Sequence, residues 1–267
     1  MLTPRRRVTL CVCLHRRTIF DTRMASETTT VDAQAIHDRL DDVRRRVKQA
    51  CERSNRSPSE VTIVGVGKTF PQEALEAARQ AGLKDFGENR VQELEEKSIA
   101  MPGVYNGGDV RWHLVGHLQR NKVKTAIEHF DVFHALDSPR LAREIEKRAE
   151  RIDRVITAFV QVNISGEDSK YGLPVDEVHP YLDSIARYDY VRVVGLMTIP
   201  SLVDDPEDVR PEFRHMRELL EQYDESENPQ VDLQYLSMGM TNDFEVAIEE
   251  GATHIRIGRG IFGPRDY

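Results

Sequence analysis

Short apolar runs alternate along the chain with longer polar stretches. The first pattern is amphipathic and predicts a helix over Val31–Arg53. Eight apolar runs of strand length follow it, namely Val61–Gly67, Lys84–Gly87, Val110–Val115, Val132–Leu136, Val155–Asn163, Val191–Met197, Leu233–Ser237 and His254–Gly258. Helix-favouring stretches separate these runs at Gln72–Ala81, Val91–Ile99, Asn121–His129, Ser138–Arg151, Val175–Tyr188, Glu207–Tyr223 and Asp243–Glu250. Strands that alternate with helices indicate right-handed βαβ units and a parallel sheet.

The number of strand–helix units favours a closed barrel. We therefore expect an α/β fold, a single (β/α)8 TIM barrel with an extra N-terminal helix, over residues 31–267. The length of 267 residues suits one such domain, which commonly needs about 250 residues. A doubly wound open sheet is the alternative for the same rhythm. In a barrel the functional side chains gather where strands end, so the strand ends hold the candidate residues.

The composition indicates a soluble protein from a reducing compartment. Hydrophobic residues make up 39% of the chain and charged residues 31%, which is typical of globular domains. The longest apolar run, Val155–Val162, is far shorter than the roughly 18 residues of a membrane span. Two of the three cysteines lie in the N-terminal tail, so we expect no disulfide framework and a cytoplasmic location.

Residues 1–30 form a basic tail that stands apart from the predicted fold. Residues 1–23 contain six arginines and one acid, a net charge of +5, so the rest of the chain carries −13. The tail fits a disordered or organelle-targeting segment and equally an over-extended start, since Met24 could begin the chain. The acidic body argues against nucleic-acid binding, which depends on clustered lysine and arginine.

Lys68 stands where the first predicted strand ends, within the run Gly65–Pro71. A lysine directed into an apolar barrel interior is costly unless it is paired, deprotonated or covalently used. Desolvation of such an amine makes it a nucleophile towards aldehydes. Two other interpretations are a solvated loop lysine and a nucleotide-binding phosphate loop. Thr62 in place of that loop's first glycine, and Phe70-Pro71 after it, argue against the second.

Polar residues also follow the second and third predicted strands. Asn89 comes after the second strand, where capping the next helix is the simpler interpretation of a lone asparagine. His113 and His117 are four residues apart, as in a zinc-binding helix. They straddle a glycine at a strand end, and no glutamate accompanies them as it would in a zinc helix. No metal site is therefore predicted.

The last two predicted strands end in small and hydroxyl residues. These ends are the runs 237–243 and 256–263. Backbone N–H groups at the start of a helix favour anions. Phosphate sites formed after strands seven and eight recur in barrels. Taken together, the two turns favour a phosphate-binding cup.

Seven motifs occur in order along the chain. They are VGKT at 66–69, FGENRVQE at 86–93, WHLVGHLQ at 112–119, VNIS at 162–165, KYGL at 170–173, GLMTIP at 195–200 and LSMGM at 236–240. With these motifs the chain resembles the pyridoxal phosphate homeostasis protein family, also described as proline synthetase co-transcribed-like proteins, over residues 32–267. That family adopts the alanine-racemase-like barrel of fold-type III pyridoxal phosphate enzymes.

The resemblance implies pyridoxal 5′-phosphate as the cofactor and a set of residues that bind it. Lys68 would form the Schiff base, and Arg256 would face the pyridine nitrogen. Ser237 and the backbone of Gly258 and Arg259 would hold the phosphate. The complete implied set, in which Asn89 and Met238 lie beside the cofactor, is Lys68, Asn89, Ser237, Met238, Arg256, Gly258 and Arg259.

The sequence departs from the family pattern at three places. Gly67 replaces a usual serine, Arg90 replaces a usual tyrosine, and Arg259-Gly260 replaces a usual Thr-Ala pair. The last change removes a hydroxyl donor to the phosphate. Only the backbone role of residue 259 therefore carries over, with the Arg259 side chain as an alternative source of positive charge.

The resemblance implies a pyridoxal phosphate-binding protein of intracellular cofactor homeostasis, which holds the cofactor reversibly without catalytic turnover. Its partners would be the cofactor and recipient apoenzymes, with no nucleic acid and no membrane, and we expect a monomer. The alternative is a fold-type III amino-acid racemase or decarboxylase, and a phosphate-sugar barrel enzyme without this cofactor is a third class. Racemases with this barrel take a second base from a β-rich domain that follows it, whereas here nine residues follow Gly258.

Overall fold

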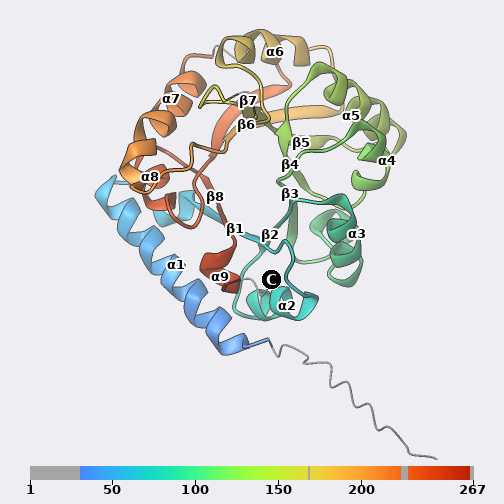
Figure 1. Ribbon diagram of the computed structural model, residues 1–267. Helices are drawn as coiled ribbons and strands as arrows, with labels where there is room; N and C mark the ends of the chain where they lie inside the picture. Colours follow the sequence, from blue (N-terminus) through green and yellow to red (C-terminus); the bar gives the residue numbers. More distant parts are fainter. Residues whose placement is uncertain (1–30, 168, 224–227, 265–267) are drawn as a thin grey trace, which may run out of the picture. The chain divides into compact units, whose positions relative to one another are not determined.

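Eight strands close a parallel barrel in the order of the sequence, and helices cover its outside (Figure 1). The computed structural model describes residues 31–264 except residue 168 and residues 224–227. The strands are β1 (Thr62–Val66), β2 (Asp85–Glu88), β3 (Arg111–Leu114), β4 (Val132–Leu136), β5 (Ile156–Val162), β6 (Val191–Thr198), β7 (Val231–Ser237) and β8 (His254–Ile257). The predicted (β/α)8 barrel is confirmed, and the open-sheet alternative is wrong. The expectations for residues 1–30 lie outside the described residues.

The helices follow the predicted stretches, with two differences. Those that the structure describes are α1 (Ala33–Arg53), α2 (Gln72–Gln80), α3 (Val91–Ala100), α4 (Val123–Ala126), α5 (Pro139–Arg151), α6 (Val178–Ile185), α7 (Arg210–Glu221), α8 (Phe244–Glu249) and α9 (Arg259–Phe262). The stretch predicted over residues 121–129 forms only a 3₁₀ turn, Arg120–Lys122, and the single turn of α4. The short helix α9 directly after β8 was not predicted. Within the described residues, none of the helices combines the length and the apolarity needed to cross a bilayer.

The predicted N-terminal helix is present as α1 and packs against α2, α8 and α9 (Figure 1). The Asp32 side chain caps it by accepting a hydrogen bond from the Ala35 N–H at 3.0 Å. Its buried positions include the predicted apolar ones, Ile36, Leu40, Val43 and Val47. On its polar side, Arg46 Nε donates to Glu245 Oε1 at 2.7 Å. The helix thus joins the first and last parts of the barrel wall.

Two kinds of side chain fill the molecule. Large apolar side chains occupy the layer between strands and helices. The largest fully buried one, Trp112 of β3, donates from Nε1 to the Met101 carbonyl at 2.8 Å. In contrast, His113, His134 and Ser237 are fully buried and hydrogen-bond one another across the barrel interior. The interior is therefore partly polar, and its polar groups lead to the functional site.

Gly195 of β6 lies opposite Tyr235 of β7, next to a shift in the register of the two strands. A Cβ atom at residue 195 would lie 1.9 Å from the Tyr235 carbonyl oxygen. That distance is far inside van der Waals contact, so only glycine allows the two backbones to approach this closely.

We expect Gly195→Ala to lower the free energy of unfolding by about 3 kcal/mol or more, because the paired strands must separate. Urea denaturation measures the loss. Arg192→Ala is the control on the same strand, since it removes only an exposed ion pair with Asp232 and should cost less than about 1 kcal/mol. Equal losses in the two variants would contradict the argument from close backbone contact.

Candidate functional site

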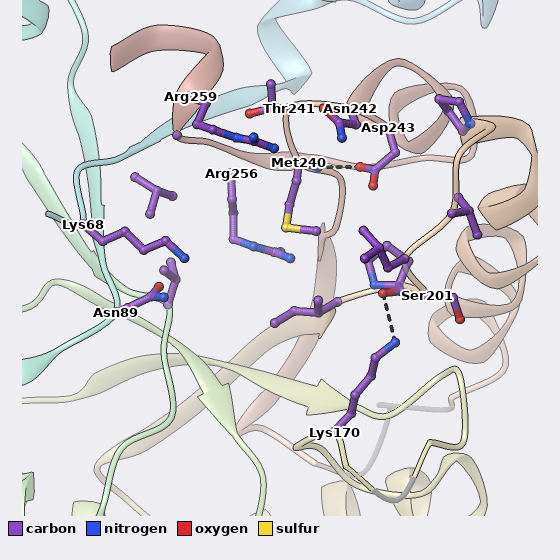
Figure 2. A pocket seen from close by; sticks show the side chains of 18 of the residues that line it. Lys68, Asn89, Lys170, Ser201, Met240, Thr241, Asn242, Asp243, Arg256 and Arg259 are labelled. Atoms are coloured by element: carbon purple, nitrogen blue, oxygen red, sulfur yellow. Dashed lines mark hydrogen bonds between the residues drawn. The ribbon is translucent and has the colours of Figure 1, made fainter. Parts of the chain in front are cut away.

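A cavity opens at the carboxyl ends of the strands, where barrels place their functional residues (Figure 2). Its volume is about 450 Å³, and segments after β1, β2, β3, β5, β6, β7 and β8 line it. Its charged lining residues are Lys68, Glu167, Lys170, Asp243, Arg256 and Arg259. Cations outnumber acids in this lining, so the cavity favours an anionic ligand.

Lys68 follows β1 in a turn that hydrogen bonds hold on both sides. The Phe70 N–H donates to the Gly67 carbonyl at 3.0 Å. The Thr69 N–H donates to Glu93 Oε2 of α3 at 2.9 Å. Thr69 has a φ of 69°, a left-handed conformation that threonine rarely adopts. The hydrogen bonds of the turn therefore offset a local cost in backbone conformational energy.

The Lys68 side chain points toward Arg256 of β8, with Asn89 beside the lysine (Figure 2). The guanidinium is buried, and its Nη1 donates to the Ser237 carbonyl at 2.7 Å and to Ser237 Oγ at 2.8 Å. Its Nη2 donates to the Thr198 carbonyl at 2.7 Å. Burial lowers the pKa of Arg256 to about 10, so the charge persists at neutral pH. A buried cation whose hydrogen-bond acceptors are neutral oxygens fits a ligand that brings electron density to it.

The cavity wall near Arg259 consists of backbone and small polar groups (Figure 2). Gly258 and Arg259 line it where α9 begins. The Gly260 N–H donates to Thr241 Oγ1 at 3.4 Å, which ties α9 to the turn after β7. Thr241 also lines the cavity, although the sequence did not single it out. This surface fits a phosphate group, because it combines a hydroxyl, backbone groups and a guanidinium.

The structure brings most of the predicted binding residues together in one cavity. Those that line it are Lys68, Asn89, Arg256, Gly258 and Arg259. Ser237 and Met238 are fully buried and are not part of the lining. Ser237 Oγ accepts from Arg256 and lies 2.8 Å from His134 Nδ1. The Ser237 side chain therefore points into the barrel interior and lies outside the described cavity lining, and its contact with a phosphate stays a prediction.

A buried ion pair supports the Lys68 turn, and sequence reasoning missed it. Lys97 Nζ of α3 donates to Glu88 Oε1 at 2.6 Å and to the Gly67 carbonyl at 2.9 Å. Burial raises the pKa of Glu88 to about 7 despite the opposing charge of Lys97. A Cβ atom at residue 67 would lie 2.9 Å from Leu75 Cδ1 and 3.1 Å from Glu88 Oε1. This crowding gives a physical reason for Gly67 in place of the family's serine.

The two histidines with zinc-like spacing have separate partners. His113 Nδ1 lies 2.8 Å from His134 Nε2 in the barrel interior. His117 Nδ1 lies 3.1 Å from Asp137 Oδ2, and its ring stacks on Tyr171 with the centroids 4.4 Å apart. The two side chains therefore do not converge on one metal position.

The fold and the cavity define a class of protein. The family model described as "Alanine racemase, N-terminal domain" matches residues 36–266. Within this class, a pyridoxal phosphate homeostasis protein of Aquifex aeolicus is 43% identical, over 86% of this chain and 98% of its own length. Its counterpart in Escherichia coli is 36% identical, over 85% of this chain and 96% of its own length. The chain therefore belongs to the pyridoxal phosphate homeostasis protein family.

Solved structures share the barrel. PipY of Synechococcus elongatus, in a structure with pyridoxal phosphate bound, is 33% identical with a TM-score of 0.72, over 85% of this chain and 100% of that chain. An alanine racemase of Corynebacterium glutamicum is 13% identical with a TM-score of 0.66, over 88% of this chain and 63% of that chain. The second likeness shows the fold alone.

We expect the stability difference between the wild type and Glu88→Gln to depend on pH. The pKa of Glu88 rises from 4.5 to about 7 on folding, so the folded protein holds this proton more tightly than the unfolded chain. The resulting stabilisation is complete below 4.5 and is lost as the pH rises through about 7, a change on the order of 3 kcal/mol. Urea unfolding of both proteins below and above this range measures it. If the difference in unfolding free energy between the two proteins stayed constant with pH, the raised pKa of Glu88 in the folded protein would be contradicted.

Proposed function

We propose that this protein holds pyridoxal 5′-phosphate reversibly on Lys68 and serves intracellular homeostasis of the cofactor without catalytic turnover. One observation carries the proposal: the Lys68 amine points toward the buried Arg256 side chain, and both residues line one cavity. Gly258 and Arg259 add a surface suited to an anion. The cofactor has an aldehyde, a ring nitrogen and a phosphate, and these three groups match the three parts of the cavity.

The named relatives support this proposal. The relatives from Aquifex aeolicus and Escherichia coli are called pyridoxal phosphate homeostasis proteins, and the PipY structure contains pyridoxal phosphate. Each of these matches covers at least 85% of this chain at 33% identity or more. The racemase alternative is supported by the description of the family model and by a solved racemase at 13% identity, which shows the fold alone.

Each cavity residue has a separate task under this proposal. The bound cofactor supplies an aldehyde carbon that bonds reversibly with a primary amine. Lys68 provides that amine, and Asn89 lies beside it. Arg256 would donate to the ring nitrogen, and because a guanidinium cannot accept a hydrogen bond, it would favour the unprotonated nitrogen. The backbone of Gly258 and Arg259 holds the phosphate, with the Arg259 side chain adding positive charge.

The absence of turnover is proposed from the acid–base groups around the cavity. Racemisation needs one proton-transferring group on each face of the bound amino acid. Lys68 serves one face. His117 is not part of the described lining and is paired with Asp137, while Lys170 Nζ is held by a carboxylate and a backbone carbonyl. A guanidinium at the ring nitrogen also weakens the ring as an electron sink.

A reversible covalent store has a chemical purpose. Free pyridoxal phosphate is an aldehyde that modifies amines indiscriminately. Attachment to a lysine inside a cavity shields the aldehyde from other amines and still allows its release. We propose recipient apoenzymes as the partners of this exchange and the cytoplasm as its location.

Borohydride reduction of the protein loaded with pyridoxal phosphate should fix the cofactor on the peptide that contains Lys68. The visible band of the bound cofactor should disappear in Lys68→Ala, because no other amine holds the same position opposite Arg256. Absorption spectra and peptide mass spectrometry measure both effects. Lys170→Ala, which removes another lysine of the cavity wall, is the matched control and should retain the band. An adduct found chiefly at Lys170 or Lys122 would contradict the proposal.

The loaded protein should turn over no ordinary amino acid at an enzymatic rate. Incubation with L- and D-amino acids tests this, with optical rotation, decarboxylation and α-deuterium exchange as readouts. Lys68→Ala separates chemistry at the site from contaminating activity. Sustained multiple turnovers that vanish in that variant would restore the racemase or decarboxylase alternative.

A further inference from the structure

A continuous row of hydrogen bonds crosses the barrel interior and ends at the cavity. Asp85 Oδ1, at the start of β2, lies 3.0 Å from His113 Nε2. His113 Nδ1 lies 2.8 Å from His134 Nε2, and His134 Nδ1 lies 2.8 Å from Ser237 Oγ. Arg256 Nη1 donates to the same Ser237 oxygen at 2.8 Å. We call these five residues the histidine relay.

The two ends of the relay determine its direction. Arg256 can only donate hydrogen bonds, and the Asp85 carboxylate can only accept them. Ser237 Oγ therefore accepts from the arginine and donates its own proton to His134 Nδ1. The His134 ring then donates from Nε2 to His113, which in turn donates from Nε2 to Asp85. The opposite direction would place an unprotonated His113 nitrogen against the carboxylate, so one arrangement with two neutral rings satisfies every bond.

The surroundings agree with an uncharged His134 ring between the Arg256 cation and the Asp85 carboxylate. Burial, together with neighbouring histidines and Arg256, lowers the pKa of His134 well below its ordinary value. Burial also lowers the pKa of His254 to about 3, and its ring centroid lies 6.0 Å from that of His134. Burial alone would raise the pKa of Asp85, but the hydrogen bond and the charge of His113, followed by the charge of Arg111, outweigh this effect and lower it. The acid end of the relay is therefore ionised.

We propose that the histidine relay holds the Arg256 guanidinium in one orientation at the cavity wall, with His134 and Ser237 as positioning residues. The ligand that this orientation serves is the cofactor of the proposed function. Ser237 then acts on the ring end of the cofactor through Arg256, in place of the direct phosphate contact that the family resemblance implied. Its hydroxyl is already committed on both sides, to the guanidinium and to the imidazole.

Nitrogen NMR of the purified protein tests the direction of the relay without any cofactor. From the hydrogen-bond direction we expect the ring proton on Nε2, and none on Nδ1, in both His113 and His134. A proton on Nδ1 of either ring, or a charged ring, would overturn the relay. This measurement needs no substitution in the core.

Rotation of the Arg256 guanidinium provides a second test in the cofactor-free protein. We expect restricted rotation about its C–N bonds in the wild type and faster rotation in both Ser237→Ala and His134→Phe. His254→Phe is the matched control, since this half-buried histidine lies beside the relay but hydrogen-bonds to Thr253. Unchanged rotation in the two relay variants, or an equal change in the control, would overturn the proposal.

Titration with pyridoxal phosphate and with pyridoxal separates positioning from direct phosphate contact. Ser237→Ala and His134→Phe should each lower the affinity for both ligands by the same factor, about tenfold. The double variant should bind them no less tightly than either single variant. A loss confined to pyridoxal phosphate and to Ser237→Ala would overturn the proposal. If the wild type binds neither ligand, the proposed function fails, whereas the ring protons and the guanidinium rotation still decide the relay.

Discussion

A guanidinium buried inside the barrel constrains the groups around it. Arg256 keeps its charge at neutral pH, and its removal from water is costly unless each donor finds an oxygen or an electron-rich partner. The ends of β6 and β7 supply such oxygens through Thr198 and Ser237. Arg256 also lines the cavity that Lys68 enters, so a ligand bound there can supply a further hydrogen-bond acceptor to the guanidinium. The need to satisfy this one cation therefore links the interior of the barrel to the chemistry at its mouth.

Lys68 and Arg256 are both supported by buried polar groups behind them. Behind Lys68, the buried pair of Glu88 and Lys97 holds the Gly67 carbonyl and so fixes the end of β1. Behind Arg256, the hydroxyl of Ser237 does the corresponding work for β8. In both cases a buried polar group on a neighbouring strand or helix holds another polar group in place. The desolvation of such pairs offsets much of the free energy that their contacts contribute, so they add little to stability. They do restrict the geometry of the groups that they hold.

The fold could be predicted because parallel strands buried on both faces read as short apolar runs, and eight of these runs lie between helical stretches. Lys68, Asn89 and Arg259 could be placed near one another because strand ends meet at one rim of a barrel. The direction of Ser237 could not be predicted, because a strand's last side chain can point to the interior or to the rim. Lys97 carried no signal either, since a lysine on a helix is usually solvated and its partner Glu88 lies on another element.

The departures from the family pattern follow from local packing and local charge. The end of β1 is crowded for a Cβ at residue 67, because the ends of the Leu75 and Glu88 side chains lie there and would have to shift. At the other end of the cavity, Arg259 stands where the family has a threonine, so one hydroxyl is lost from the anion-binding surface. Thr241 Oγ1 accepts the Gly260 N–H and lines the same cavity, so its own proton can be donated to a ligand. At the proposed phosphate site this chain therefore has a hydroxyl from Thr241 and an added positive charge from Arg259, which would offset the lost threonine hydroxyl.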